Sequence, residues 1–536
     1  MEGELKRNFQ ALGRQETPPY YMSYTIDSIK RQSAYASFGA LAKKLETSRA
    51  YLTIDVRVGS PKVDNTHEIR GGRRMIGLHE PNKAPLDENP QGLKELLWQE
   101  TDDAYREAVE NLAKVKTDKA LKVKEEDESS DFTLQSPSVS VAEPAGVKVD
   151  LDAWAQKVRA YSEPFRKLPY VLKGDASFSS EVRTKYFVNT EGSRVETTVN
   201  YMRLFISATA KADDGMELPL MLSYFGFRES DFPGEKQIEA HITAMVKTLG
   251  LLRMAPLVEA YEGPAILSGK SSGVFFHEIL GHRLEGHRQK SESESQTFKK
   301  KVHEKILPEF ISVIFDPTVK ELGALKLSGF YEYDDQGTKA EKVVAVKDGV
   351  LRDFLMTRSP IEGFPRSNGH ARCQPGQVPV SRQSNLIVTS RKHYPEKELK
   401  EMLISELKKQ GKPFGLYFKE IQGGFTLTTR SLPNAFTVNP LVVYKIFVDG
   451  RPDELVRGVN FIGTPLTTFD KIIATGDTPE VFNGMCGAES GDVPVSAVSP
   501  SLLVRQIEVQ KKGKSQDKLP ILPPPPSQIE ERGSSR

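Results

Sequence analysis

Runs of alternating, β-branched or aromatic residues predict strands in both halves of the chain. The sequence TEGS at 190–193 separates two of these runs and predicts a hairpin turn. Asp348-Gly349 predicts a second hairpin tip within 343–356, because Asp-Gly favours tight two-residue turns. The predicted strands and strand-rich stretches are 20–28, 50–59, 185–189, 194–200, 201–210, 262–269, 440–463 and 502–510.

Apolar residues recur at helical spacing between these strands. The longest such pattern, 90–115, opens with Pro90 and has apolar positions such as Leu93, Leu97 and Ala108. Further helices are expected at 4–12, 150–162, 234–252, 271–286 and 395–410. We therefore expect an α+β fold with several domains, built from largely antiparallel sheets with flanking helices.

The chain has 536 residues, which is too long for one hydrophobic core and indicates roughly two to four domains. Residues 116–149 are rich in charge, Ser and Pro, which is typical of a linker or a mobile excursion. Beyond 510, Pro523–Pro526 lie among charged residues; we expect a disordered, solvated tail, with a polyproline ligand as the alternative. The predicted units are an N-terminal α+β domain at 1–115, a linker at 116–149, a middle α+β domain at 150–255, a C-terminal domain at 256–510 and a tail at 511–536.

Composition narrows the classes of partner. Hydrophobic residues make up 38% and charged residues 27% of the chain, as in a soluble globular protein, and a net charge of +2 gives no reason to expect nucleic acid or a membrane surface. No apolar run approaches the roughly 18 residues of a spanning helix. The first fifteen residues lack the apolar core of a signal peptide, so we expect a cytoplasmic protein, with export after signal removal as the alternative.

The chain contains only two cysteines, Cys373 and Cys486. One disulfide is possible but would be a thin framework for a chain of this length. The simpler interpretation is that both cysteines are reduced, free thiols. The more specific interpretation is that one of them is a metal ligand.

The densest chemical pattern is His277-Glu278-Ile279-Leu280-Gly281-His282, inside a segment that is predicted to be helical. In a hydrolytic zinc site, imidazoles hold the metal, the metal polarises a carbonyl and acidifies a water, and a carboxylate takes that water's proton. The familiar spacing for this device is H-E-x-x-H. This chain has one residue more between its histidines.

The extra residue puts the two histidines on different faces of a regular helix, because five residues at ~100° each leave them ~140° apart. Histidines four residues apart are offset by only ~40° and can meet one metal. A π-bulge at Gly281 would restore the smaller offset, and a helix that ends near Gly281 would also serve.

Spacing alone is a weak signal, so a structural interpretation stands beside the metal site. Glu278, His282 and Glu285 could form a polar face while the apolar residues around them pack. Three of nine histidines nevertheless fall within 277–287. The candidates for a third ligand are Glu285, His287 and the distant Cys486, which is predicted to lie in a loop dense in glycine. Elsewhere in the chain, the glycine pairs Gly71-Gly72 and Gly423-Gly424 are not part of a phosphate-binding or dinucleotide-binding loop motif.

HEILGHRLEG at 277–286 resembles the H-E-x-x-G-H-x-L-E-G segment of the TldD/PmbA metalloproteases. The resemblance extends in order over roughly 185–510. Segments similar to those of the family lie at 189–210, 315–358, 367–372, 381–388 and 485–509, the last of which contains Met485-Cys486-Gly487.

The resemblance implies one zinc ion per chain, held by His277, His282 and Cys486, with Glu278 as general base. It implies that Glu285 orients a histidine and that His287 is not a ligand. It further implies structural roles for Asp334 and Asp335, and it assigns no role to Cys373, which we expect to be a free thiol.

The activity implied is hydrolysis of unfolded or small peptides, which would enter as added strands. The resemblance also implies a dimer, either with itself or with a paralogue that lacks the metal ligands; this chain would be the catalytic type. The alternative is a non-catalytic, peptide-binding or regulatory scaffold with structural zinc, similar to a gyrase modulator. Glu278 argues against it, because a closed structural site needs no base.

Overall fold

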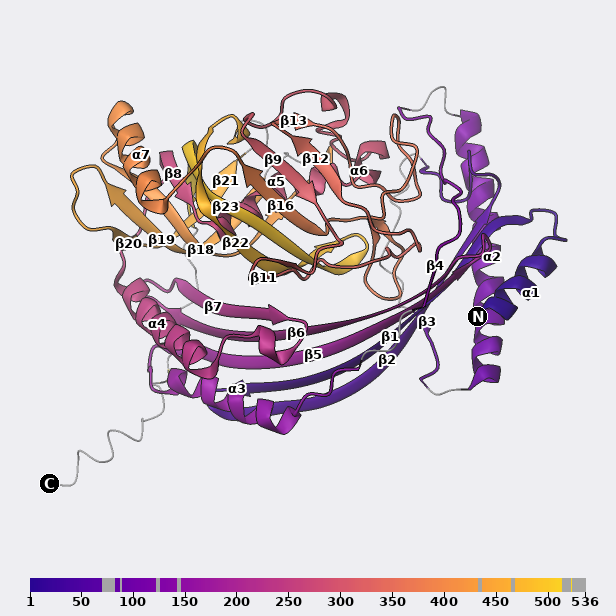
Figure 1. The fold of residues 1–536 in the computed structure, drawn as a ribbon, viewed down its shortest axis with the longest axis horizontal. Helices are drawn as coiled ribbons and strands as arrows, with labels where there is room; N and C mark the ends of the chain where they lie inside the picture. Colours follow the sequence, from indigo (N-terminus) through magenta and orange to yellow (C-terminus); the bar gives the residue numbers. More distant parts are fainter. Residues whose placement is uncertain are drawn as a thin grey trace.

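A computed structural model describes residues 1–69, 82–86, 89–121, 126–141, 146–431, 436–463, 468–512 and 522. Two large sheets dominate it, and Figure 1 shows the curved first sheet lying below a compact C-terminal unit built around the second. The fold is α+β with largely antiparallel strands and flanking helices, as the sequence pattern predicted.

The first sheet has seven strands in the order β3-β2-β1-β5-β6-β4, with β7 also paired to β6. Burial alternates along the second half of β6, where Met202, Leu204 and Ile206 pack into a core with the helices on the outer face (Figure 1). The opposite face lies towards the C-terminal unit (Figure 1). The strands are β1 (Pro19–Ser37), β2 (Ala40–Val58), β3 (Asn82–Lys83), β4 (Val139–Val141), β5 (Val171–Asn189), β6 (Arg194–Lys211) and β7 (Glu217–Gly226).

Four helices flank this sheet, and all four were predicted. α1 and α2 cover one end, and α3 and α4 cover the outer face (Figure 1). α3 runs beyond the predicted end at Ser162 and includes Pro164, because Phe165 is fully buried against the sheet. Their bounds are α1 (Glu2–Leu12), α2 (Pro90–Leu121), α3 (Leu151–Arg166) and α4 (Glu235–Met254).

Strands of the predicted N-terminal and middle domains share this one sheet. β1 pairs antiparallel with β5 from Ser23↔Asn189 to Ser37↔Asp175. The segment predicted as a linker is also partly structured: α2 continues to Leu121, and β4 pairs with β6. Its charge does not keep it in solvent, because buried Asp127 and Asp131 accept hydrogen bonds from backbone and side-chain groups.

The second sheet has twelve strands and forms the core of the C-terminal unit. Its main path runs β13-β12-β9-β16-β23-β21-β19-β18-β8, with β17, β20 and β22 attached. The longer strands are β8 (Tyr261–Leu267), β9 (Ile311–Phe315), β12 (Val343–Lys347), β16 (Asn385–Ser390), β18 (Phe414–Thr426), β19 (Phe436–Phe447), β21 (Val459–Gly463), β22 (Ile472–Ala488) and β23 (Gly491–Lys511). The shorter elements are β10 (Glu321–Leu322), β11 (Leu325–Lys326), β13 (Val350–Leu351), β14 (Ala371–Arg372), β15 (Val380–Ser381), β17 (His393–Tyr394), β20 (Glu454–Val456) and α7 (Glu396–Lys409).

Several local predictions in this unit are confirmed. The hairpin tip at Asp348-Gly349 has φ of 50° and 80°, the left-handed conformation that an Asp-Gly turn favours. The predicted helix at 395–410 is α7. The closing strand is longer than predicted, since β23 begins at Gly491 and pairs with β22 over most of that strand's length.

Helix α5 (Gly269–Ile279) lies inside this unit and is buried at every position except Lys270. Phe275 and Phe276 belong to the main hydrophobic core. A Cβ added at Gly273 would lie 2.8 Å from the carbonyl oxygen of Ala497, so the helix backbone approaches β23 closely.

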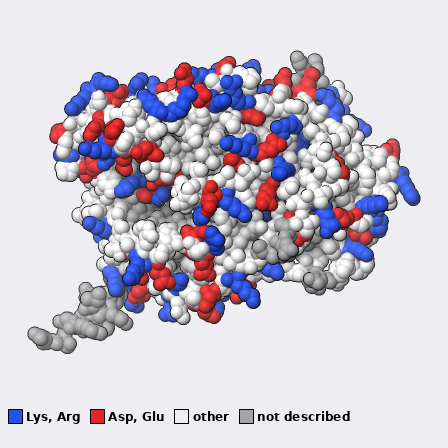
Figure 2. Space-filling view, in the orientation of Figure 1, with Lys and Arg blue, Asp and Glu red and all other residues white. Residues whose placement is uncertain are grey.

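Lys and Arg side chains are interspersed with Asp and Glu over the face shown in Figure 2. None of the helices that the structure describes is long and apolar enough to cross a membrane. The glycine pair Gly71-Gly72 and the proline run Pro523–Pro526 lie outside the described residues.

Candidate metal centre

The helix that carries His277 ends before it reaches His282. Ser268 caps its start by accepting a hydrogen bond from the backbone N–H of Ser271, and α5 stops at Ile279. A 3₁₀ turn, η2 (Gly281–Leu284), follows and carries His282. Of the two distortions considered from the sequence, the structure contains the helix end, and the two imidazole rings lie with their centroids 4.9 Å apart.

Gly281 is required because there is no room for a larger side chain, and not because its backbone conformation needs a glycine. Its φ is not positive, but a Cβ at this position would lie 1.9 Å from Oε1 of the buried Gln383 side chain. The amide of Gln383 donates to the carbonyl oxygen of His277 at 3.2 Å. Glycine therefore lets Gln383 reach the end of α5.

Strand β22 brings Cys486 to the two histidines. Cys486 pairs with Val493 near the turn of the β22–β23 hairpin, so it lies on a strand and not in the loop suggested by its glycine-rich surroundings. Its sulfur is 3.4 Å from Nε2 of His282. One potential ligand atom from each of His277, His282 and Cys486 lies within 4.8 Å of the other two, and all three residues are buried.

The charges around Cys486 favour the form of its side chain that binds metals. Burial alone would raise the pKa of the Cys486 thiol, but His282 and His277 lower it well below its usual value. This shift favours the thiolate, the form that binds metals. Burial alone would lower the pKa of His282, but Cys486 and Glu285 raise it, so a bound metal would displace a proton from this imidazole. Two imidazoles and a thiolate at this spacing are a donor set that fits a metal such as zinc.

Glu285 sets the orientation of His282. Its Oε2 accepts from Nδ1 of His282 at 3.2 Å, which leaves Nε2 facing Cys486. Arg288 donates to the same oxygen at 2.8 Å, and Arg382 lies 3.6 Å from the other. Burial favours the neutral acid, but His282 and the two arginines bring the pKa of Glu285 to about 2.

Arg382 also fixes the hairpin turn that follows Cys486. Its guanidinium donates to the carbonyl oxygens of Cys486 and Gly491 and to Oγ of Ser490. Sequence reasoning placed Arg382 and Gln383 in a family-like segment but gave them no role. A buried arginine is not visible from a sequence pattern, because the pattern alone suggests an exposed side chain.

His287, the rejected ligand candidate, points elsewhere. It pairs with Glu489, which also accepts from Arg288 at 2.8 Å. The two cysteines are both free thiols and form no disulfide.

Asp334 and Asp335 lie outside the cluster and organise neighbouring loops. Asp334 accepts from three backbone N–H groups, those of Gln336, Thr338 and Ala371. Asp335 accepts from the backbone N–H of Cys373 and pairs with Lys185 of the first sheet.

Glu278 lies beside the three residues, at the border of a cavity. Its Oε2 is 4.0 Å from Nε2 of His282, and burial raises its pKa above the usual value. Strand β18 passes so close that a Cβ at Gly424 would lie 2.5 Å from Cγ of Glu278. The pair Gly423-Gly424 therefore belongs to the site, because a glycine in a strand permits close backbone approach.

A cavity of about 600 Å³ connects this site to the space between the two sheets. Its lining includes His277 and Glu278, strand β6, and the edges of β18 and β22. Volumes of this order are usual for small-ligand sites.

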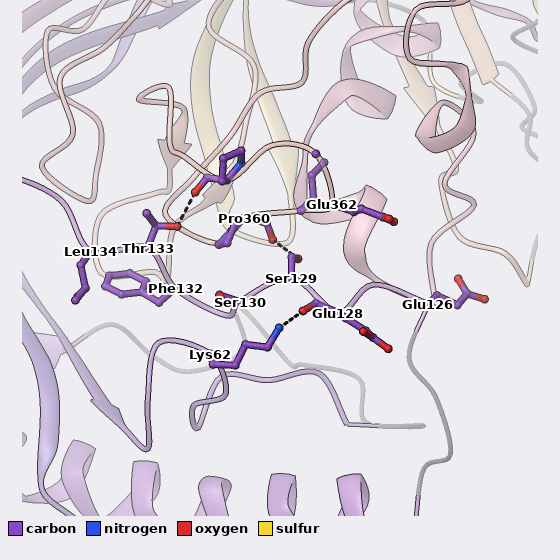
Figure 3. A pocket seen from close by; sticks show the side chains of 13 residues that line it. Lys62, Glu126, Glu128, Ser129, Ser130, Phe132, Thr133, Leu134, Pro360 and Glu362 are labelled. Carbon is purple, nitrogen blue, oxygen red and sulfur yellow. Dashed lines mark hydrogen bonds between the residues drawn. The ribbon is translucent and has the colours of Figure 1, made fainter.

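Another cavity, of about 780 Å³, is shown in Figure 3, and its lining includes none of the three candidate metal ligands. The 126–134 segment and the 360–365 loop enclose it, joined by hydrogen bonds from Ser129 to Pro360 and from Thr133 to Pro365. Glu126, Glu128 and Glu362 line it, and its described lining contains no His or Cys. Its size alone does not make it the reactive site.

Two family models match the chain. They are the PmbA/TldA metallopeptidase central domain over residues 137–234 and the PmbA/TldA metallopeptidase C-terminal domain over residues 261–511. A metalloprotease of Archaeoglobus fulgidus is 31% identical over 280 residues, which span 52% of this chain and 59% of that protein. A zinc metalloprotease TldD homolog of Saccharolobus solfataricus is 24% identical over 253 residues, which span 47% of this chain and 52% of that protein.

The fold is similar to that of TldE from Thermococcus kodakarensis, with a TM-score of 0.62 and 14% identity over 95% of this chain and 99% of the other. The two family models place the chain in a family of metallopeptidases. The chain belongs to the TldD/PmbA family, as its motifs predicted.

Proposed function

We propose that this protein is a zinc-dependent metallopeptidase that hydrolyses peptide bonds in unfolded or small peptides. The observation that carries the proposal is the convergence of His277, His282 and Cys486 beside the buried carboxyl group of Glu278. The zinc metalloprotease name of the Saccharolobus solfataricus relative supports the choice of metal.

In the proposed site, His277, His282 and Cys486 hold one zinc ion and leave a fourth position open. When bound, zinc would supply Lewis acidity, polarising the scissile carbonyl and lowering the pKa of a water towards ~7.

Glu278 is the proposed general base. It accepts a proton from the attacking water and returns it to the leaving amine. Its burial suits this task, because a raised pKa brings a carboxyl group closer to the operating pH. Glu285 keeps Nε2 of His282 directed at the centre through the hydrogen bond at Nδ1.

The substrate is proposed to bind as an extended chain. Among described residues, β22 pairs only with β23 along 479–488, and β18 pairs only with β19 beyond Phe418. Both strands contribute residues to the cavity next to Glu278. An unpaired strand edge offers backbone groups to a peptide, while a cavity of about 600 Å³ excludes a folded domain.

The family resemblance also suggests that the chain forms a dimer. The chain would form a homodimer, or a heterodimer with a paralogue that lacks the metal ligands. Light scattering of the purified chain, alone and with such a paralogue, tests this.

Replacing Glu278 by Gln tests the function. The variant should keep about one zinc per chain by elemental analysis and lose cleavage of unstructured peptides by a factor of about 100 or more. Glu362→Gln, in the separate cavity of Figure 3, is the control and should cleave normally. Unchanged cleavage by Glu278→Gln would refute the mechanism and favour a peptide-binding scaffold with structural zinc.

A further inference from the structure

We propose that Arg203 binds a carboxylate of the substrate, so that the site selects peptides with an acidic side chain or a free C-terminal carboxyl group near the scissile bond. The inference rests on the proposed function and names the substrate class of the same cavity. Neither the motifs nor the predicted metal site pointed to this residue.

The first sheet forms the floor of the cavity, and Arg203 projects from it. Strand β6 alternates, so Met202 and Leu204 pack towards α3 and α4, while Arg203 and Phe205 face the other way. Arg203 lines the same cavity as His277 and Glu278. A peptide lying in this cavity would therefore have the floor of the sheet on one side and α5 on the other.

Arg203 is the only charged residue among the described strand residues of the first sheet that line the cavity; Glu181 shares its face but lies opposite Tyr201 and outside the lining. In the sheet register, Arg203 stands opposite Phe225 of β7 and Ser179 of β5. Phe205 stands opposite Ser223, which also lines the cavity. The floor thus presents one guanidinium on a mostly apolar surface.

Arg203 forms no ion pair or hydrogen bond with any residue that the structure describes. Burial is the one cause that acts on its pKa, and it lowers that pKa. A cation that is removed from water without a counter-charge is costly, which is why buried charges are normally paired.

The other cations of the cavity already have partners. Nζ of Lys270 lies 3.2 Å from Glu420, and Nζ of Lys326 pairs with Glu321 and lies 3.6 Å from Asp231. Arg203 is therefore the lining cation that a ligand can neutralise.

A carboxylate is the group that fits Arg203 within a peptide. The guanidinium can donate two parallel hydrogen bonds to a carboxylate, and charge-assisted bonds of this kind are about twice as strong as neutral ones. Glu278 lies in the same cavity and repels a second negative charge. The peptide is therefore oriented with its carboxylate at Arg203 and away from Glu278. Because Arg203 and Glu278 line one cavity of about 600 Å³, which holds only a short stretch of extended chain, the selected carboxylate is expected close to the scissile bond in the sequence.

Peptide binding to the Glu278→Gln variant separates this inference from catalysis. Fluorescein-labelled unstructured peptides are made in matched sets, with single Glu/Gln or Asp/Asn exchanges and with a free or amidated C-terminus. Fluorescence anisotropy gives their dissociation constants. We expect one carboxylate to tighten binding by about 10- to 100-fold, and Arg203→Gln in the same background to abolish the difference. The position of that carboxylate distinguishes a side chain from a C-terminus.

Lys270→Gln is the control, because Lys270 is a paired cation in the same cavity. It should keep the discrimination, and Arg203→Lys should keep part of it. Equal affinity for carboxylate and amide peptides, no binding at all, or an equal effect of Lys270→Gln would overturn the inference. Zinc-dependent cleavage by the wild-type chain tests the proposed function separately, since carboxylate selectivity in Glu278→Gln does not depend on turnover.

Discussion

The sulfur of Cys486 lies 3.4 Å from Nε2 of His282, although 204 residues separate them in the chain. This contact joins the 3₁₀ turn that follows a buried helix to the end of a strand in the second sheet. A metal bound there would close a long loop and tie the two elements together, so metal binding should also stabilise the fold.

The two cysteines should differ sharply in reactivity. Both are buried, with 4% and 6% of their surface exposed at Cys486 and Cys373, but burial raises the pKa of Cys373 to about 11 while the histidines lower that of Cys486. In metal-free protein at pH 7, we expect iodoacetamide to alkylate Cys486 faster, as measured by mass spectrometry of the two peptides. Thiolates are the reactive form.

Zinc provides the control for this experiment. Added zinc should protect Cys486 and leave Cys373 unchanged. Equal rates at both thiols, or protection of neither by zinc, would contradict the assignment of Cys486.

Glu285 should stabilise the metal-free fold in a pH-dependent manner. Its pKa falls from the usual 4.5 to about 2 in the folded state, so its contribution is present above pH 4.5 and is lost as the pH falls towards 2. Lowering a pKa by one corresponds to about 1.4 kcal/mol, so Glu285→Gln should lower the free energy of unfolding at pH 7 by about 3 kcal/mol. Urea unfolding at pH 7 and near pH 2.5 measures the difference.

The difference between wild type and Glu285→Gln should shrink at the lower pH. Glu304→Gln, which removes an exposed ion pair with Lys301, should have little effect at either pH. A destabilisation by Glu285→Gln that is the same at both pH values would show that packing, not charge, is responsible.

Gly424→Ala should impair catalysis and spare the metal. The added Cβ would lie 2.5 Å from Cγ of Glu278 and displace its carboxyl group. A misplacement of about 1 Å at a reacting group can reduce the rate about 100-fold. We expect kcat/KM for peptide cleavage to fall by a factor of about 10 or more with zinc content unchanged.

Gly146→Ala is the matched control, since its Cβ would meet nothing within 4 Å. It should cleave peptides normally. Full activity in Gly424→Ala would show that Glu278 does not need its observed position.

The hydrophobic pattern predicted most helices and strands because it is local. It did not predict that β1 pairs with β5 and joins two predicted domains in one sheet, since that register joins residues as distant as Ser23 and Asn189. Backbone pairing at this separation leaves no periodic signal in either strand.

Only part of the candidate metal site could be predicted from the sequence. The spacing of His277 and His282 required a distorted or ended helix, and the structure ends it at Ile279. Cys486 became the favoured third ligand only through the family resemblance, because no spacing rule links a strand to a helix so far away. Gly424 was set aside for lacking a phosphate-loop context, and Arg203 gave no signal because a single arginine in an alternating strand normally faces solvent.

X-ray absorption at the zinc edge tests the central claim, that His277, His282 and Cys486 hold one zinc ion. We predict one sulfur neighbour at about 2.3 Å and at least two nitrogen neighbours at about 2.0–2.1 Å, with the sulfur contribution lost in Cys486→Ala and retained in Cys373→Ala. A zinc spectrum without sulfur, or one in which Cys486→Ala changes nothing, would contradict the claim.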